Sequence, residues 1–334
     1  MSNRIDSLQW LRAIAAFWVL FTQVFQRMGL QPFGYTFSGQ WGVDIFFILS
    51  SFIIYFTTKD SSSWARFARK RIFRIFPLYL FCVAAYYFFF HITSGIKLTG
   101  VQWTQNVLMV PFSDAIGYHS LLVGQAWSTC YELYFYFILA MLLLLNIPKQ
   151  RLIVLLLALY GLGLLAGCFG GMMQYGWWRY LLSLIASPNI FMFCIGISIA
   201  MWYGRITPPI KVLERCTPVK QMTILSLLFI VYIAICLTRY NFFSSIAVST
   251  VAFIICLLSQ PLLKEANLAN HVMTYLGDIS FSVYLVHSLI IRILMFIGVN
   301  NYQLLLPTTI LATIILSSLT YKLVEKPFIN LAKR

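Results

Sequence analysis

The sequence predicts an all-α integral membrane protein of about ten transmembrane helices, and three observations lead to this class. The chain has 334 residues, of which 60% are hydrophobic and only 10% are charged. A soluble domain carries about 25% charged residues. Its mean hydropathy is +0.83, and ten apolar runs are each long enough to cross a bilayer. We expect residues 1–334 to form a single transmembrane domain with no soluble domain attached.

The ten apolar runs follow one another from end to end of the chain. They lie near 11–28, 41–57, 75–93, 127–146, 151–170, 181–203, 222–238, 244–260, 276–297 and 304–324. The connection at 94–126 is longer than a plain connector, so we expect it to cap a cavity or contact a substrate. No internal repeat is visible, which disfavours an inverted-repeat transporter.

The positive charges predict the orientation. With the N-terminus in the cytoplasm, 18 of the 24 lysines and arginines fall on the cytoplasmic side, and only Lys97, Arg179 and Arg239 fall outside. Basic residues gather on the cytoplasmic side of membrane proteins, so both termini are expected there, with an even number of spans. The same rule explains the net charge of +15 without a nucleic-acid partner.

The first run, 11–28, is the one around which we expect the others to surround a central cavity. It carries Arg12 at one end and Gln23 well inside it. At about 100° and 1.5 Å per residue, the two side chains share a helix face and lie roughly 16 Å apart. A polar stripe on a membrane helix is costly unless it faces protein or water. This helix is therefore expected to line an active-site channel.

A basic cluster lies directly before the third run. Its members are Arg66, Arg69, Lys70, Arg71 and Arg74. In a helix the first three share one face and the last two share another. One interpretation is a topology anchor that also touches anionic membrane lipids, and composition alone favours it. The other is a phosphate clamp, because arginine presents fixed donors to phosphate oxygens.

Few other ionisable residues fall inside the runs. Glu132 is an isolated carboxylate in the fourth run, which predicts either a functional group or an ion-pair partner for Arg12 or Arg292. His287 lies midway along the ninth run, where a lone histidine is more often a packing residue. The remaining histidines do not cluster as metal ligands would, so no metal site is expected. The seven cysteines form no CxxC pair and are expected to be mostly buried free thiols.

Six short motifs occur along the chain. They are DSLQWLRAIAA at 6–16, GVDIFFILS at 42–50, RKRIFRIFPLY at 69–79, WSTCYE at 127–132, LGDISFSVYLVH at 276–287 and VEKP at 324–327. Together, and in this order, they resemble the acyltransferase-3 family of membrane acyltransferases. The chain is most similar to the O-antigen acetylases of enteric bacteria and their phages.

The resemblance implies a ten-helix enzyme of the bacterial inner membrane. Such a protein moves an acetyl group from cytoplasmic acetyl-CoA to a hydroxyl of a surface or lipid-linked glycan such as O-antigen. The family's basic stretch, here Arg69, Arg71 and Arg74, would hold the CoA phosphates. Glu325, at the inner end of the last run, would order these arginines or face water.

The catalytic base in this resemblance belongs at position 23, supported by Arg12 or Asp6, with Glu132 as a further catalytic candidate. The family has a histidine there, and this chain has Gln23, which has no titratable group. This version is therefore either catalytically impaired or served by another base, for which His287 is the best substitute. Ser51 also stands where the family has glycine.

Two other functional classes remain open from the sequence. A transporter or flippase of a lipid-linked saccharide would explain ten spans and buried polar groups equally well, but not the motifs around a basic inner loop. A binding or assembly protein without catalysis is supported directly only by Gln23.

Overall fold

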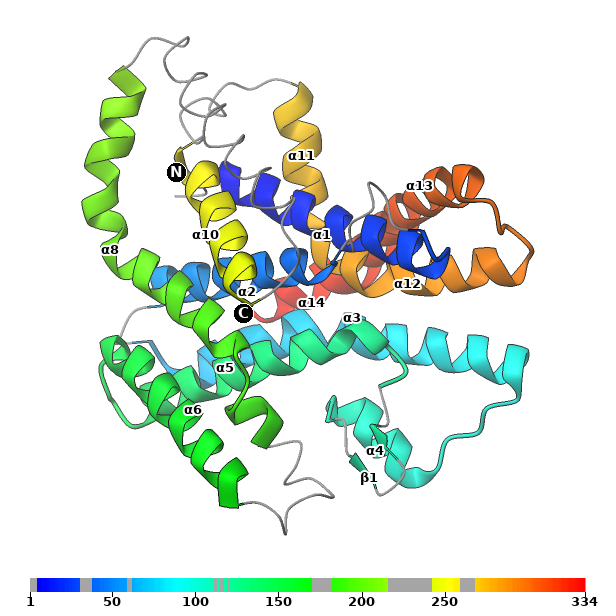
Figure 1. Cartoon of the computed structure of the whole chain (residues 1–334), viewed down its shortest axis with the longest axis horizontal. Coiled ribbons are helices and arrows are strands. Elements are labelled where there is room, and N and C mark those ends of the chain that lie inside the picture. The colour runs from blue at the N-terminus through cyan, green and yellow to red at the C-terminus, as the bar shows by residue number, and fades with distance from the viewer. Residues whose placement is uncertain are drawn as a thin grey trace. The chain divides into compact units, whose positions relative to one another are not determined.

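The structure is a computed structural model that describes residues 5–30, 38–58, 62–110, 113–114, 117–118, 121–169, 182–215, 242–258 and 268–333. In these ranges the chain is helical apart from one pair of two-residue strands (Figure 1). The elements are α1 (Asp6–Arg27), α2 (Gln40–Thr57), α3 (Trp64–Ser94), α4 (Gly100–Leu108), β1 (Ser113–Asp114), β2 (Gly117–Tyr118), the 3-10 turn η2 (Gly124–Ala126), α5 (Trp127–Leu144), the 3-10 turn η3 (Lys149–Arg151), α6 (Leu152–Phe169), α8 (Asn189–Arg215), α10 (Phe242–Leu258), α11 (Leu268–Asp278), α12 (Ser280–Phe296), α13 (Tyr302–Thr320), the π-helix η5 (Tyr321–Glu325) and α14 (Lys326–Leu331).

Six of the described helices are long and apolar enough to cross a membrane, so the all-helical, multi-pass class is confirmed. They are Asp6–Arg27, Gln40–Thr57, Trp64–Ser94, Gly124–Leu144, Lys149–Gly167 and Tyr302–Leu331. Asn189–Tyr203 and Phe243–Leu258 are apolar but shorter. The predicted span at 222–238 lies outside the described residues. Ten spans, a central cavity and cytoplasmic termini stay predictions.

The predicted span at 276–297 is not one straight helix. The structure has two helices, α11 and α12, which meet at Ile279 with a bend of 69°, and the pair would make a seventh span if it crosses as one. Both helices pack against α1 (Figure 1). Gly277 allows this approach, because a Cβ there would lie 2.2 Å from the Gln9 carbonyl oxygen. The bend thus reflects tertiary packing, which hydropathy does not report.

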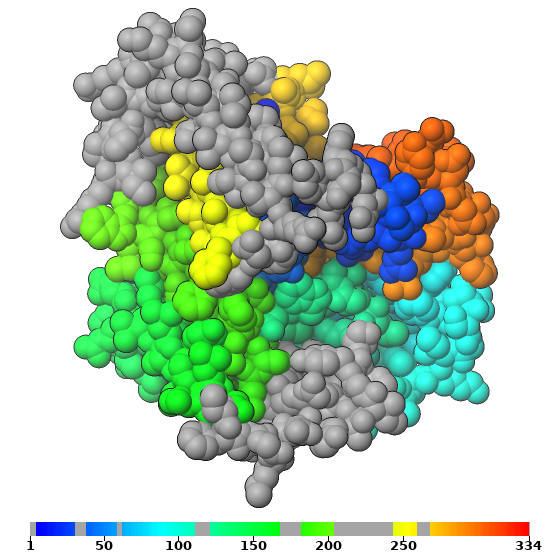
Figure 2. All heavy atoms as spheres, viewed as in Figure 1, coloured from blue at the N-terminus to red at the C-terminus, as the bar shows by residue number. Residues whose placement is uncertain are grey.

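The chain divides into two compact units, Met1–Thr57 with Phe191–Ser317 and Thr58–Ile190 with Ser318–Arg334. Two compact units can belong to one transmembrane domain, so the single domain over 1–334 stays a prediction. In unit 1, α1 packs against α2, α10, α11 and α12. Figure 2 shows the C-terminal end of α1, in blue, at the surface of this unit, where Gln26 and Arg27 are exposed.

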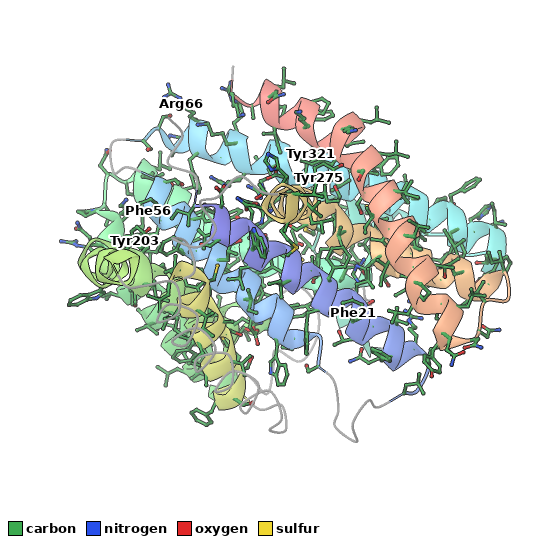
Figure 3. All side chains as sticks on the ribbon, turned by 90° about the horizontal axis from the view of Figure 1, so that it is seen from above. Phe21, Phe56, Arg66, Tyr203, Tyr275 and Tyr321 are labelled. Carbon is green, nitrogen blue, oxygen red and sulfur yellow. The ribbon has the colours of Figure 1, made fainter. Side chains whose placement is uncertain are left out.

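Small residues bring the helices of unit 1 close together. Gly42 on α2 faces the Ala15 backbone, since a Cβ there would lie 2.6 Å from the Ala15 oxygen. Gly196 on α8 likewise faces Ser51, whose Oγ donates to the Ile48 oxygen at 3.0 Å. The serine that replaces the family's glycine is therefore accommodated by a glycine on the neighbouring helix. The rings of Phe56 and Tyr203, 5.2 Å apart, join the same two helices (Figure 3).

In unit 2, α3 packs against α5, η5 and α14. The long connection at 94–126 is fastened to α3 by polar side chains at several points. The Tyr79 hydroxyl donates to the Asn106 oxygen at 2.7 Å, and Gln125 Nε2 donates to the Tyr86 hydroxyl at 3.1 Å. A capping box between Thr99 and Gln102 begins α4. The connection is thus a packed part of this unit, and its role towards a cavity or substrate stays a prediction.

Candidate functional site

The residues predicted to form the site fall into both units, and each group is described by itself. Asp6, Arg12 and Gln23 lie on α1 in unit 1. The second group, in unit 2, comprises Arg69, Arg71, Arg74, Glu132 and Glu325.

Asp6, Arg12 and Gln23 lie on one unbroken helix, α1, and the predicted shared face of Arg12 and Gln23 requires such a helix. Asp6 is in the first turn of α1, where a carboxylate interacts favourably with the helix dipole. Arg12 and Gln23 are both half-buried, and Arg12 Nη1 donates to Gln9 Oε1 at 3.5 Å. The amide of Gln23 can donate and accept hydrogen bonds but cannot take up a proton near neutral pH. A reaction that needs a base must find it at another residue.

His287 is the fully buried histidine of α12, and its geometry makes it the strongest substitute. Its Nδ1 lies 2.9 Å from the Val283 oxygen, and a carbonyl can only accept, so Nδ1 carries the proton. Nε2 is buried and has no hydrogen-bond partner among the residues that the structure describes. The ring of Tyr284 lies 6.1 Å from the imidazole. A neutral His287 therefore presents an unprotonated nitrogen inside unit 1.

Asp44 is a buried carboxylate that the sequence analysis did not select. It is 1% exposed and accepts from Ser245 Oγ on α10 and from Gln40 Nε2 at 3.0 Å. Its position in an apolar run was the signal that could have identified it, because an ionisable residue at membrane depth has a partner or a function. Its contacts join α2 to α10.

The basic cluster at the start of α3 divides into two faces, as its spacing predicts. Arg66, Arg69 and Lys70 are exposed, and Figure 3 shows Arg66 extending away from the helix. Arg71 and Arg74 are half-buried. The exposed face is suited to lipid headgroups or solvent, whereas the inner face brings cationic charge into unit 2.

Arg71 contacts two aromatic rings. Its guanidinium carbon is 5.4 Å from the centroid of Phe67, on the same helix, and 5.5 Å from that of Tyr136 on α5. The Tyr136 hydroxyl donates to the Glu132 carboxylate, and both groups interact electrostatically with Arg71. Arg71 therefore lies close enough to Glu132 to interact with it electrostatically. Tyr136 was missed from the sequence, although it follows Glu132 by one helical turn.

Glu325 is the last residue of the π-helix η5 and is only 2% exposed. Both η5 and α14 pack against α3, where the rings of Phe73 and Phe328 lie 6.2 Å apart. The Glu325 side chain is thus buried, in a segment that packs against the helix with the basic cluster. Single π-helical turns are frequent at functional sites.

The described residues contain no group of three histidine, cysteine or acidic side chains that could hold a metal ion. Cys82, Cys130, Cys194 and Cys256 are buried free thiols, which confirms that prediction for these four.

In the described part of the chain, six or seven helices are long and apolar enough to cross a membrane, which indicates a multi-pass membrane protein. The profile of the acyltransferase-3 family, described as an acyltransferase domain, matches residues 5–322. The chain belongs to this family and is an acyltransferase, which confirms the resemblance. Nodulation protein 10 of Rhizobium leguminosarum bv. viciae is 26% identical to this chain. The alignment is 361 positions long and covers 99% of this chain and 95% of that protein. No solved structure matches.

Proposed function

We propose that the protein is an O-acetyltransferase of the bacterial inner membrane. It takes the acetyl group from cytoplasmic acetyl-CoA and passes it to a hydroxyl of a surface or lipid-linked glycan such as O-antigen. The observation that carries this proposal is the pair of half-buried arginines, Arg71 and Arg74, on the inner face of a basic cluster in a membrane acyltransferase. Guanidinium groups in such a site suit a donor that carries several phosphates.

The reaction is a direct transfer between the two substrates. The sugar hydroxyl oxygen attacks the thioester carbonyl, the carbon–sulfur bond breaks, and CoA leaves as its thiolate. A base takes the hydroxyl proton, which finally protonates the thiolate. Hydrogen-bond donors stabilise the oxyanion that forms in between. Position 23, with Arg12 or Asp6 as support, is the place for the base on α1.

In this chain, Gln23 orients the hydroxyl by a hydrogen bond but leaves the proton where it is. We therefore propose that this version binds both substrates and transfers acetyl slowly. The second candidate for the base is His287, because its Nε2 is buried and without a hydrogen-bond partner in the described part of the chain.

The test of the reaction is mass spectrometry of surface polysaccharide from cells with and without the gene. A gain of one acetyl group per repeating unit, absent with Arg71→Ala, is the expected result for an active version. Transfer that is too slow for this test is measured in vesicles that receive radiolabelled acetyl-CoA on the cytoplasmic side. Identical polysaccharide and no label transfer, even after Gln23→His, would refute the proposed reaction.

The rival function is transport of a lipid-linked saccharide, and acetyl-CoA separates the two. A ligand at 100 times its Kd stabilises the folded protein by about 2.7 kcal/mol. Thermal unfolding in detergent should therefore shift with acetyl-CoA if the protein is the proposed enzyme. A transporter of a lipid-linked saccharide does not have to bind acetyl-CoA, so that function does not require a shift in thermal unfolding.

A further inference from the structure

The guanidinium of Arg71 contacts the aromatic rings of two residues on two different helices. Phe67 lies one turn earlier on α3, and Tyr136 lies on α5, with guanidinium-to-centroid distances of 5.4 and 5.5 Å. The two rings also meet edge to face, with centroids 6.2 Å apart and an interplanar angle of 87°. Two cation–π contacts favour a position in which the guanidinium meets both rings. The place of the Arg71 guanidinium therefore depends on how α3 packs on α5.

Glu132 fixes the ring of Tyr136. It lies one turn earlier on α5 and accepts the Tyr136 hydroxyl, so the phenol cannot swing about its Cα–Cβ bond without losing that hydrogen bond. The carboxylate also balances the charge of Arg71, whereas Arg74 adds a like charge nearby. An arginine in an apolar setting is costly unless an opposite charge compensates it. Glu132 thus supports Arg71 both by its charge and through Tyr136.

One donor of this held guanidinium remains unused. Arg71 Nε is buried and has no hydrogen-bond partner among the described residues. A buried charged donor without an acceptor is unfavourable, and native proteins rarely leave one so. The chemistry that satisfies it is an anionic oxygen, and the second charge on the same face, Arg74, favours an oxygen that belongs to a phosphate.

We propose that Glu132 and Tyr136 are positioning residues that hold Arg71 so that its Nε meets a phosphate oxygen. The proposal rests on the proposed function, in which this phosphate belongs to acetyl-CoA; a phospholipid headgroup offers the same chemistry. Glu132 then acts through Arg71 and needs no contact with the reacting atoms. This role differs from the catalytic one that its isolated position in the sequence suggested.

The test compares two ligands in nanodiscs of neutral lipid. Acetyl-CoA carries the phosphates, whereas S-acetylpantetheine carries the same thioester without them. Tyr136→Phe and Glu132→Gln should each weaken acetyl-CoA binding by about three- to ten-fold and leave S-acetylpantetheine unchanged. The matched control is Tyr134→Phe, which removes a buried hydroxyl with no described partner from the same helix and should change neither affinity.

A double-mutant cycle tests whether the effect passes through Arg71. Arg71→Lys keeps the charge and removes Nε, so it should weaken acetyl-CoA binding by about ten-fold, the size of one charge-assisted bond. Adding Tyr136→Phe to Arg71→Lys should then cost nothing further. Full additivity, or equal losses for S-acetylpantetheine, would show that Tyr136 only supports the fold and would overturn the proposal.

The outcome for the wild-type protein separates this proposal from the proposed function. If wild type binds acetyl-CoA but Tyr136→Phe and Glu132→Gln bind it equally well, the positioning role is refuted and the function stands. If wild type does not bind acetyl-CoA in any lipid, the proposed function fails. Stabilisation by anionic phospholipid that Arg71→Lys abolishes would then identify a lipid phosphate as the partner of Nε.

Discussion

Replacement of Gly277 by alanine should damage both the stability and the activity of the protein. Gly277 lies at the end of α11, against the backbone of α1. A Cβ there would lie 2.2 Å from the Gln9 oxygen, 2.7 Å from its carbonyl carbon and 2.8 Å from its Cα. All three are backbone atoms, so no side-chain rotation relieves the contact. The two helices would have to separate by roughly 1 Å to reach ordinary van der Waals distance.

The size of the effect follows from two opposing terms. Overpacking costs about 1–3 kcal/mol, and the upper end applies here because rigid backbone must move. The gain in helix propensity from glycine to alanine returns at most about 1 kcal/mol. For a chain of 334 residues, the net loss of about 2 kcal/mol corresponds to a fall in Tm of roughly 3 °C. Arg12, bonded to Gln9 one turn away, would move with the backbone.

The assay is thermal unfolding in detergent together with acetyl transfer in vesicles. Gly161→Ala is the matched control, since a Cβ at this position of α6 meets nothing within 4 Å. It should leave Tm unchanged or slightly raised. A shift of about 1 Å near reacting groups can cost about a hundred-fold in rate, so transfer, measured in the Gln23→His background, should fall in Gly277→Ala alone. Equal Tm values and rates in the two variants would refute the reasoning.

Three further expectations can be measured independently. Gln23→His should raise acetyl transfer at least about a hundred-fold, because general-base help is worth about 10²–10⁴ in rate; full activity with Gln23 in place would contradict this and point to His287. A cysteine introduced at Ser62 should react with impermeant reagents only from the cytoplasmic side, with wild type as the background control, and labelling from outside intact cells would invert the predicted orientation. Ser245→Ala should cost about 1–3 kcal/mol in the free energy of unfolding, because buried Asp44 loses a donor. Ser249→Ala, one turn along, removes a hydroxyl with no described partner and should be nearly neutral, so equal losses would exclude a special role for the carboxylate contact.

Hydropathy predicted the helices of this protein well but not their ends. The first run, 11–28, lies within a helix that already begins at Asp6, because its polar first turns pack on α11. The third run, 75–93, belongs to a helix that begins at Trp64 and includes the whole basic cluster. Charged turns continue a helix without adding to its apolar signal. The bend at Ile279 was not predicted, although Gly277, Asp278 and Ser280 interrupt the apolar pattern there.

The candidate site shows the same limit. Helical spacing correctly separated the exposed basic face from the inner face with Arg71, because both faces belong to one helix. Spacing of four residues could also have paired Glu132 with Tyr136. The contact between Tyr136 and Arg71 depends on how α5 packs against α3, and no pattern within either helix encodes that packing.

Position 23 illustrates how a fold and a reaction can be separated in one helix. The neighbours of Gln23, Thr22 and Val24, are fully buried and hold α1 in its packing, with Thr22 Oγ1 bonded to the Val19 oxygen at 2.9 Å. Gln23 itself is half-buried, so the packing of α1 depends little on which polar side chain stands there. A glutamine with a reach similar to that of histidine keeps the hydrogen-bonding capacity of the site and removes only its proton acceptor. A substitution at this position can therefore change the chemistry of the helix without changing its packing, which agrees with a matching profile that spans residues 5–322.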